Sequence, residues 1–179
     1  MKPYLLVIYN FVKLHIKKLS AKESSISSVL MFSRNTKLLL NQKCKVVLED
    51  RIISDGRTTI IVDEGAELKI GSHVYFNEGA MISCKCSVTI GNGCKFGPNV
   101  KIFDNNHKFD ATNGVSGAHS VGSIEIGENC WIGTNVVILK GARIGKNSVI
   151  GAGCVISGEI PEKSIVTQGR DLLIQPMRE

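Results

Sequence analysis

The segment FDNNHKFDATNGVSGAHSVGS, residues 103–123, carries the side chain most suited to catalysis, His107. A neutral imidazole accepts a proton near pH 7, so an accessible histidine can act as a general base. His119 lies in the same segment among glycines and could contact a substrate. His73 and His15 fall on a predicted turn and in a predicted terminal helix, where solvated roles are expected. His107 is therefore the first candidate for a catalytic residue.

The six cysteines do not follow the spacing of a zinc site. Cys84 and Cys86 form C-x-C, without a second pair at zinc-ligand spacing. Four cysteines fall in a register of small residues within the repeat described below, where reduced and buried side chains are expected: Cys86, Cys94, Cys130 and Cys154. The sequence therefore predicts no metal site.

A six-residue repeat defines the elements that must position these side chains. Isoleucine returns at every sixth position, at Ile126, Ile132, Ile138, Ile144, Ile150 and Ile156. Two residues earlier at each step stands a small or short side chain, at Cys130, Val136, Ala142, Ser148 and Cys154. Neither a helix nor a single strand has a period of six, whereas short strands and turns stacked as a parallel β-helix do. The glycines after these isoleucines are expected to provide backbone freedom at the turns.

The same phase is visible earlier in the chain, with one slip and one interruption. It runs through Ile70, Phe76 and Ile82, slips by two residues, and resumes at Ile90, Phe96 and Ile102. It stops at residues 103–123 and returns at 124–160. An insertion in a solenoid leaves at a corner and projects as a loop, commonly on the binding side. This places His107 at the edge of a predicted groove.

The N-terminal residues 1–22 predict an amphipathic helix, with Leu5, Ile8, Tyr9, Val12, Ile16 and Leu19 on one face. Two interpretations stay open: a helix docked on the solenoid end or on a partner subunit, or a helix on a membrane surface with its lysines facing anionic lipid. Residues 20–28 are serine-rich and predict a linker. The predicted division is a helical and linker segment (1–45), a β-helix (46–168) and a tail (169–179).

The net charge of +6 is concentrated at the N-terminus. Residues 1–22 contain five lysines and no acidic residue, whereas the remainder holds 17 basic against 16 acidic residues. A nearly neutral body argues against a nucleic-acid partner. No secretion signal is evident, so a cytoplasmic protein is expected. If residues 1–22 bind a membrane surface, the expected position is peripheral, at the inner face of the membrane.

The repeat, together with NCWIGTNVVILKGARIGKNSVIGAGCVI and DNNHKF, resembles the hexapeptide-repeat acyltransferases over roughly residues 45–168. The similarity is nearest to the branch that acetylates sugars: galactoside, maltose and xenobiotic acetyltransferases and the O-acetyltransferases of capsular polysaccharide synthesis. It implies an all-β, left-handed parallel β-helix with a protruding loop, assembled as a homotrimer with active sites between subunits. It also implies acetyl-CoA as the donor, without a metal.

The resemblance implies roles for individual residues. His107 corresponds to the catalytic base, and Asn77 and Asp104 are assigned to the acceptor. The expected donor side comprises Trp131, Gly133, Thr134, Gly151, Ala152 and Arg170, with the Thr134 N–H at the thioester carbonyl as an oxyanion donor. The small residues are expected to let the pantetheine chain approach the backbone. Asp104, Asp110 and a backbone carbonyl are all candidates to orient His107.

The sequence thus predicts an acetyl-CoA-dependent O-acetyltransferase acting on a sugar or polysaccharide-precursor hydroxyl. One alternative is N-acetylation of a nucleotide-linked amino sugar, and another is a non-catalytic β-helix assembly module. A zinc enzyme of the γ-carbonic-anhydrase type would need two histidines five residues apart, and no such pair occurs. Ser157-Gly158-Glu159-Ile160-Pro161 replaces the usual T-K-D-I-P of the family, which affects the nucleotide end of the donor rather than the chemistry.

Overall fold

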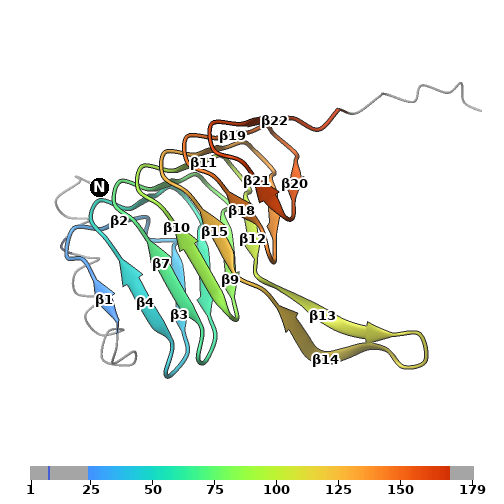
Figure 1. Cartoon of the computed structure of the whole chain (residues 1–179). Helices are drawn as coiled ribbons and strands as arrows, with labels where there is room; N and C mark the ends of the chain where they lie inside the picture. The colour runs from blue at the N-terminus through green and yellow to red at the C-terminus, as the bar shows by residue number, and fades with distance from the viewer. Residues whose placement is uncertain (1–7, 9–23, 170–179) are drawn as a thin grey trace, which may run out of the picture.

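The computed structural model describes Ile8 and residues 24–169 of the 179-residue chain. These residues wind into a β-helix with three parallel sheets, A, B and C, and each full coil contributes one strand to each sheet (Figure 1). Sheet A contains β1 (Ser25–Ile26), β4 (Lys45–Leu48), β7 (Glu67–Ile70), β10 (Ser87–Ile90), β15 (Ile124–Ile126), β18 (Arg143–Ile144) and β21 (Glu159–Ile160).

Sheets B and C complete each coil. Sheet B contains β2 (Met31–Phe32), β5 (Ile53–Ser54), β8 (Tyr75–Phe76), β11 (Lys95–Phe96), β16 (Trp131–Ile132), β19 (Val149–Ile150) and β22 (Ile165–Val166). Sheet C contains β3 (Lys37–Leu40), β6 (Thr59–Val62), β9 (Met81–Cys84), β12 (Lys101–Phe103), β17 (Val137–Leu139) and β20 (Val155–Ile156). The turns between the sheets are called the A–B, B–C and C–A corners below.

The coils stack in strict register. Phe96 pairs with Ile132 and Ile132 with Ile150 across neighbouring coils. The strands of sheet A rise at the front of Figure 1 while the coils advance from the N-terminal to the C-terminal end, which is the sense of a left-handed coil. The left-handed parallel β-helix implied by the sequence is therefore confirmed.

The core is the column of inward side chains that the repeat predicted. All six isoleucines of the repeat are buried, and Val136 and Ala142 are fully enclosed beside them. Phe76 and Phe96 stack with their ring centroids 4.7 Å apart. Cys94, Cys130 and Cys154 are buried, Cys86 is partly buried, and all six cysteines are free thiols. The predicted role of these cysteines as small core residues is confirmed for three of the four and holds in part for Cys86.

The β-helix begins earlier than the predicted boundary at residue 46. β1 pairs with β4, β2 with β5, and β3 with β6, so residues 24–45 form the first coil rather than a helical and linker segment. The six-residue phase is obscured there because longer strands and polar inward residues such as Ser24 and Thr36 replace the isoleucine pattern. The predicted helix of residues 1–22 lies outside the described residues except for Ile8. No described helix is long and apolar enough to cross a membrane.

The glycines that follow the isoleucines have a different role from the predicted one. A Cβ on Gly133 would lie 2.7 Å from the Ala152 nitrogen of the next coil. The glycine is thus required for close stacking of coils rather than for a special turn conformation. The left-handed backbone at this corner falls two residues later, on Asn135 with φ 57°. Asparagine tolerates this region because its short polar side chain hydrogen-bonds locally.

The predicted insertion is an ordered hairpin at the C–A corner. It consists of β13 (Asn105–Asp110) and β14 (Gly114–Val121), which pair antiparallel and project away from the coil (Figure 1). Phe109 and Val115, paired near its tip, are 78% and 72% exposed. The protruding loop at about 103–123 is confirmed, and it is a two-stranded arm.

Candidate functional site

His107 lies near the base of the hairpin, opposite His119 on the other strand. A bulge follows this pair, because the next paired residues are Phe109 and Val115. The bulge turns the Ser116 carbonyl toward the imidazole, 3.3 Å from Nδ1 of His107. A carbonyl can only accept a hydrogen bond, so this contact favours the tautomer with the proton on Nδ1. Nε2 is then left with its lone pair, as a general base requires. Among the three candidates that could orient His107, the structure places a backbone carbonyl there.

His119 packs against His107, with ring centroids 4.4 Å apart and an angle of 40° between the rings. Partial desolvation, together with the positive charges of Lys85 and His107, lowers the pKa of His119, and Asp63 opposes this shift. A lowered pKa keeps His119 uncharged at neutral pH. A neutral imidazole can both donate and accept a hydrogen bond, which suits contact with a sugar hydroxyl.

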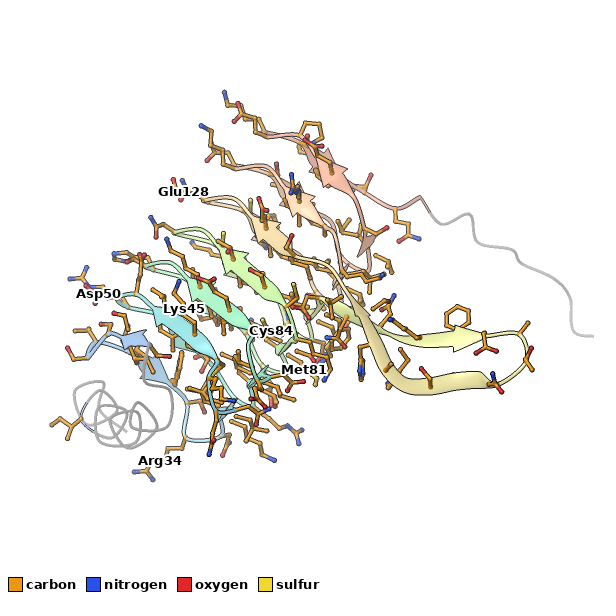
Figure 2. All side chains as sticks on the ribbon, turned by 60° about the horizontal axis from the view of Figure 1, so that its bottom comes forward. Arg34, Lys45, Asp50, Met81, Cys84 and Glu128 are labelled. Atoms are coloured by element: carbon orange, nitrogen blue, oxygen red, sulfur yellow. The ribbon has the colours of Figure 1, made fainter. Side chains whose placement is uncertain are left out.

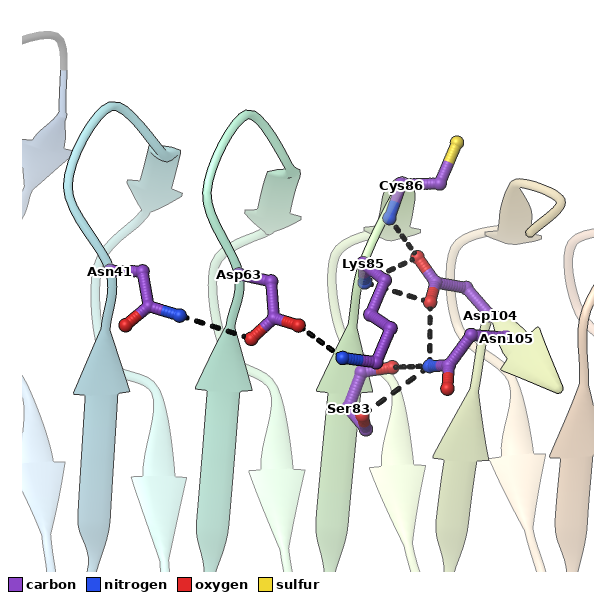
Figure 3. A network of polar contacts seen from close by, with 7 residues as sticks. All are labelled: Asn41, Asp63, Ser83, Lys85, Cys86, Asp104 and Asn105. Carbon is purple, nitrogen blue, oxygen red and sulfur yellow. Dashed lines mark hydrogen bonds and ion pairs between the residues drawn. The ribbon is translucent and has the colours of Figure 1, made fainter. Parts of the chain in front are cut away.

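Lys85 and Asp63 lie at the C–A corner in the two coils before the hairpin. They form an ion pair in which both side chains are largely shielded from solvent, and Asn41 of the preceding coil donates a hydrogen bond of 3.1 Å to Asp63 (Figure 3). Their charges act on His119, so they border the same surface as the histidine pair. This edge therefore presents both signs of charge and an amide beside the candidate base.

Asp104 does not face an acceptor, contrary to its predicted role. Its side chain is completely buried, and both carboxylate oxygens accept hydrogen bonds from the Lys85 and Cys86 amides of the preceding coil (Figure 3). A buried carboxylate whose oxygens are already used has no free acceptor for a sugar. Asp110 also does not orient His107, because it caps the Thr112 and Asn113 amides at the far end of the hairpin.

The predicted donor residues gather at the B–C corner. The register of sheet B places Asn77, Gly97, Gly133 and Gly151 at one corner position in successive coils. Thr134 and Ala152 follow at the next position. Within the described residues, the Thr134 N–H donates no hydrogen bond, whereas the flanking amides of Gly133 and Asn135 bind Ile150 and Pro98 carbonyls. The Thr134 amide is therefore available to a ligand.

Trp131, Asn77 and Arg170 are the other residues predicted to bind the donor or the acceptor. Trp131 on β16 points outward and is 58% exposed, as the sequence predicted. Asn77 accepts the Glu78 amide with its side-chain oxygen at 2.8 Å, which leaves its NH₂ group to donate. Arg170 lies outside the described residues. The small residues at this corner and the nearby indole are called the predicted donor wall below, while the glycines themselves are explained by coil stacking.

One chain does not bring His107 and the predicted donor wall together. The predicted donor wall lies at the B–C corner and His107 at the C–A corner, and a strand of sheet C runs between the two in every coil. Four to five residues of extended chain span roughly 15 Å. In the sequence, His107 and the residues of the predicted donor wall occur within 50 residues of each other. The sequence therefore does not show that they lie at different corners of the coil.

Sequence reasoning did not identify Lys85, Asp63 or the Ser116 carbonyl. The two-residue slip before Ile90 marked the unusual corner at Lys85, and the glycines around Ser116 marked the bulge. Neither signal specifies which atoms face the imidazole. Among residues 24–169, no group of three or more His, Cys, Asp or Glu side chains is arranged to hold a metal ion.

Comparison with known proteins agrees with this architecture. Residues 123–158 match the model of the bacterial transferase hexapeptide (six repeats) family. The galactoside O-acetyltransferase of Lactococcus lactis is 34% identical over 62% of this chain and 53% of its own length. The galactoside O-acetyltransferase of Escherichia coli is 38% identical over 54% of this chain and 48% of its own length. The chain thus spans about half the length of these curated relatives.

Solved structures give the same result. A maltose O-acetyltransferase from Clostridium difficile has a TM-score of 0.51 and 29% identity, covering 75% of this chain and 64% of the other. A hexapeptide-repeat-containing acetyltransferase from Vibrio cholerae has a TM-score of 0.52 and 28% identity, covering 55% and 56%. Residues 123–158 thus match the hexapeptide-repeat family, and the chain is similar to galactoside and maltose O-acetyltransferases, which agrees with the resemblance seen in the sequence.

Proposed function

We propose that the protein is an acetyl-CoA-dependent O-acetyltransferase that acts on a sugar hydroxyl. The observation that carries this proposal is the exposed His107 imidazole, whose Nδ1 faces the Ser116 carbonyl and whose Nε2 is left to accept a proton. The names of the similar galactoside and maltose O-acetyltransferases support a sugar acceptor. The same Vibrio cholerae acetyltransferase was also solved in complex with acetyl coenzyme A, in a structure that is 18% identical over the aligned part with a TM-score of 0.53. That complex supports the choice of donor.

In the proposed reaction, Nε2 of His107 takes the proton from the sugar hydroxyl while that oxygen attacks the thioester carbonyl. The Ser116 carbonyl holds the Nδ1 proton and stabilises the imidazolium that forms. The Thr134 N–H stabilises the negative charge that develops on the carbonyl oxygen. When the carbon–sulfur bond breaks, His107 returns its proton to the departing thiolate. No covalent acetyl-enzyme is needed, because acceptor and donor react directly.

This reaction needs a second copy of the chain, because one copy holds the two halves of the site at opposite edges of sheet C. If the C–A corner of one copy meets the B–C corner of the next, His107 faces Thr134 across the interface. Three copies in a ring would then turn their C sheets toward the common axis. We therefore propose a homotrimer with active sites between subunits.

The outer face of sheet C suits this arrangement. Seven of its outward side chains are apolar: Leu39, Ile61, Met81, Phe103, Val137, Leu139 and Val155. The other four, Lys37, Thr59, Ser83 and Lys101, are polar or charged. Leu39 and Val155 are 50% and 54% exposed in the single chain. The outer face of sheet A is charged instead, with ion pairs between Lys45 and Glu67 and between Arg143 and Glu125. Figure 2 shows Asp50 and Glu128 on the edge of the coils away from the hairpin. Burial of the sheet C face in a trimer removes apolar surface from water, whereas sheet A remains suited to solvent.

The proposed donor implies where in the cell the protein acts, whereas the identity of the acceptor sugar must be found by experiment. Since acetyl-CoA is a cytoplasmic metabolite, we propose that the protein acts in the cytoplasm. A sugar unit of a polysaccharide, or its precursor, is the proposed acceptor class. Galactosides and maltose are the first probes, because the similar enzymes carry these names.

The test is release of coenzyme A thiol from acetyl-CoA in the presence of methyl β-galactoside, maltose and glucosamine. The His107→Ala variant should fold normally and lose about 10³-fold in turnover, because general-base catalysis contributes about 10²–10⁴-fold. The matched control is Asn106→Ala, since Asn106 is exposed, precedes His107 and has no side-chain hydrogen bond within the described residues.

Mass spectrometry of the product identifies whether oxygen or nitrogen has been acetylated. Acetylation of glucosamine alone, at nitrogen, would replace the proposal with the amino-sugar alternative. Wild-type turnover in His107→Ala, or no thiol release with any sugar, would reject the assignment.

A further inference from the structure

The C–A corner at Lys85 and Cys86 is tighter than the corners of the two preceding coils. Four residues connect β3 to β4 and β6 to β7, but only two connect β9 to β10. In the four-residue corner at 63–66, the Ala66 amide binds the Asp63 carbonyl at 3.1 Å. The other two-residue corner, at 157–158, contains Gly158 with φ 85°. Lys85 and Cys86 have neither a glycine nor a positive φ, so their amides need a different partner.

That partner is the buried side chain of Asp104 from the following coil. Its Oδ1 accepts from the Lys85 amide at 2.8 Å, and its Oδ2 accepts from the Cys86 amide at 2.7 Å (Figure 3). A third donor, the Asn105 side-chain NH₂, lies 3.0 Å from Oδ1 and also reaches the Ser83 carbonyl at 3.2 Å. Both oxygens are therefore satisfied by groups that can only donate.

Asp104 also closes the base of the hairpin. Its carbonyl accepts from the Gly122 amide at 2.9 Å, at the point where β14 returns to the coil. His107 follows three residues after Asp104, and its partner His119 precedes Gly122 by three. One residue thus connects the tight corner through its side chain and the histidine hairpin through its backbone.

We propose that Asp104 is a positioning residue that fixes the two walls of the acceptor site, the Lys85 corner and the histidine pair, relative to each other. The inference rests on the proposed function, because it takes the surface beside His107 as the place where the acceptor binds. It assigns to Asp104 a role distinct from contact with substrate. The role requires a carboxylate, since an amide in its place would direct an NH₂ group at a backbone N–H.

The Asp104→Asn variant tests this role with nearly unchanged side-chain volume. We expect kcat/KM for the sugar acceptor to fall about 10²-fold, the size of loss that a displacement of about 1 Å can cause. The affinity for acetyl-CoA, measured by calorimetry, should not change, because the donor wall lies at the other edge of sheet C. Asn105→Ala removes only the third donor and should give a smaller loss in the same direction. It also keeps the test available if Asp104→Asn does not fold.

The matched control is Asp110→Asn. Asp110 likewise accepts two backbone amides, from Thr112 at 2.9 Å and Asn113 at 2.8 Å, but at the far end of the hairpin. If Asp104 only caps backbone amides and positions nothing, Asp104→Asn and Asp110→Asn should reduce kcat/KM by the same factor. Equal losses in Asp104→Asn and Asp110→Asn would overturn the proposal. A parallel loss of acetyl-CoA affinity in Asp104→Asn would overturn it as well, because the damage would then be general.

Titration of the His119 ring by NMR gives a measurement that does not depend on turnover. Desolvation lowers the pKa of His119 most, the charges of Lys85 and His107 lower it further, and Asp63 raises it. If Asp104→Asn releases the corner, Lys85 moves away and the His119 pKa rises. A His119 pKa that falls or does not change would show that the corner has not moved, and would overturn the proposal. This measurement stands even if the wild-type protein acetylates no sugar, which would reject only the proposed function.

Discussion

The two edges of sheet C differ in almost every respect. The B–C corner repeats the same shape from coil to coil, with Asn77, Gly97, Gly133 and Gly151 at one position and a free amide at Thr134. The C–A corner changes from coil to coil. It carries a four-residue turn, then the tight corner at Lys85, then the hairpin of His107.

This contrast separates two kinds of chemistry. The regular edge offers backbone groups and small side chains at the coil spacing of about 4.8 Å, which suits an extended ligand such as the coenzyme A arm. The irregular edge offers side chains held at particular angles, which suits proton transfer and recognition of a sugar.

The largest expected effect comes from combining copies that lack the proposed base with copies whose predicted donor wall is blocked. Ala152→Trp should block the donor wall and His107→Ala should remove the base, so each variant alone should lose most acetyl transfer. If sites form between copies, co-assembly of the two variants in equal amounts restores about one quarter of the sites, as random pairing around a ring predicts. Thiol release by the co-expressed mixture measures this recovery.

Assembly must be checked in the same sample, by differential tagging and size-exclusion chromatography. Mixed assemblies with no more activity than either variant alone would show that each site is contained in a single copy. The baseline activity is measured on the two variants purified separately and then mixed under conditions in which they do not exchange subunits.

A second prediction concerns the apolar face between the edges. The double substitution Leu39→Lys and Val155→Lys places charges on exposed positions of sheet C, which a single chain tolerates. In a trimer these lysines would be buried without partners, at a cost of several kcal/mol per ion. We expect the assembly to dissociate, and acetyl transfer to fall with it, as measured by light scattering and turnover.

Ile165→Lys is the control for that experiment. Ile165 is an even more exposed aliphatic residue, 77% accessible, but on sheet B. It should leave the mass of the assembly unchanged. If Ile165→Lys alone dissociates the assembly, or if the sheet C variant stays assembled, the interface between copies lies on another face.

The smallest effect is expected at the regular edge itself and appears in stability. Gly133→Ala would place a Cβ 2.7 Å from the Ala152 nitrogen and 2.9 Å from the Ile150 oxygen. Overpacking of this kind costs about 1–3 kcal/mol. The Tm should fall by about 2–4 °C for each kcal/mol, measured by calorimetry. Gly169→Ala, whose Cβ would meet no atom of the described residues within 4 Å, should leave the Tm unchanged. Equal midpoints for both variants would mean that coil stacking does not require Gly133.

Much of the fold could be predicted from the sequence because a stacked coil repeats its environment. Each inward isoleucine occupies the same site as the one six residues before it, so the period survives in the sequence from Ile126 to Ile156. The first coil was missed because its inward positions include Ser24 and Thr36, which carry no such period. The place of His107 in the loop that leaves the coil could be predicted from the interruption of the repeat, and the outward direction of Trp131 from its phase. Asp104 was assigned to the wrong partner because a sequence does not show which side of a corner a carboxylate occupies.

The sequence by itself determined the coil, its inward side chains and the place where the repeat is interrupted. These depend on local period and burial, which neighbouring residues encode. The tertiary structure decided that the Ser116 carbonyl faces His107, that Asp104 binds the corner of another coil, and that the two edges of sheet C lie apart. Such contacts join residues about 10–20 positions apart through the stacking of coils and a bulged hairpin. They depend on three-dimensional register, and no local pattern of residues specifies it.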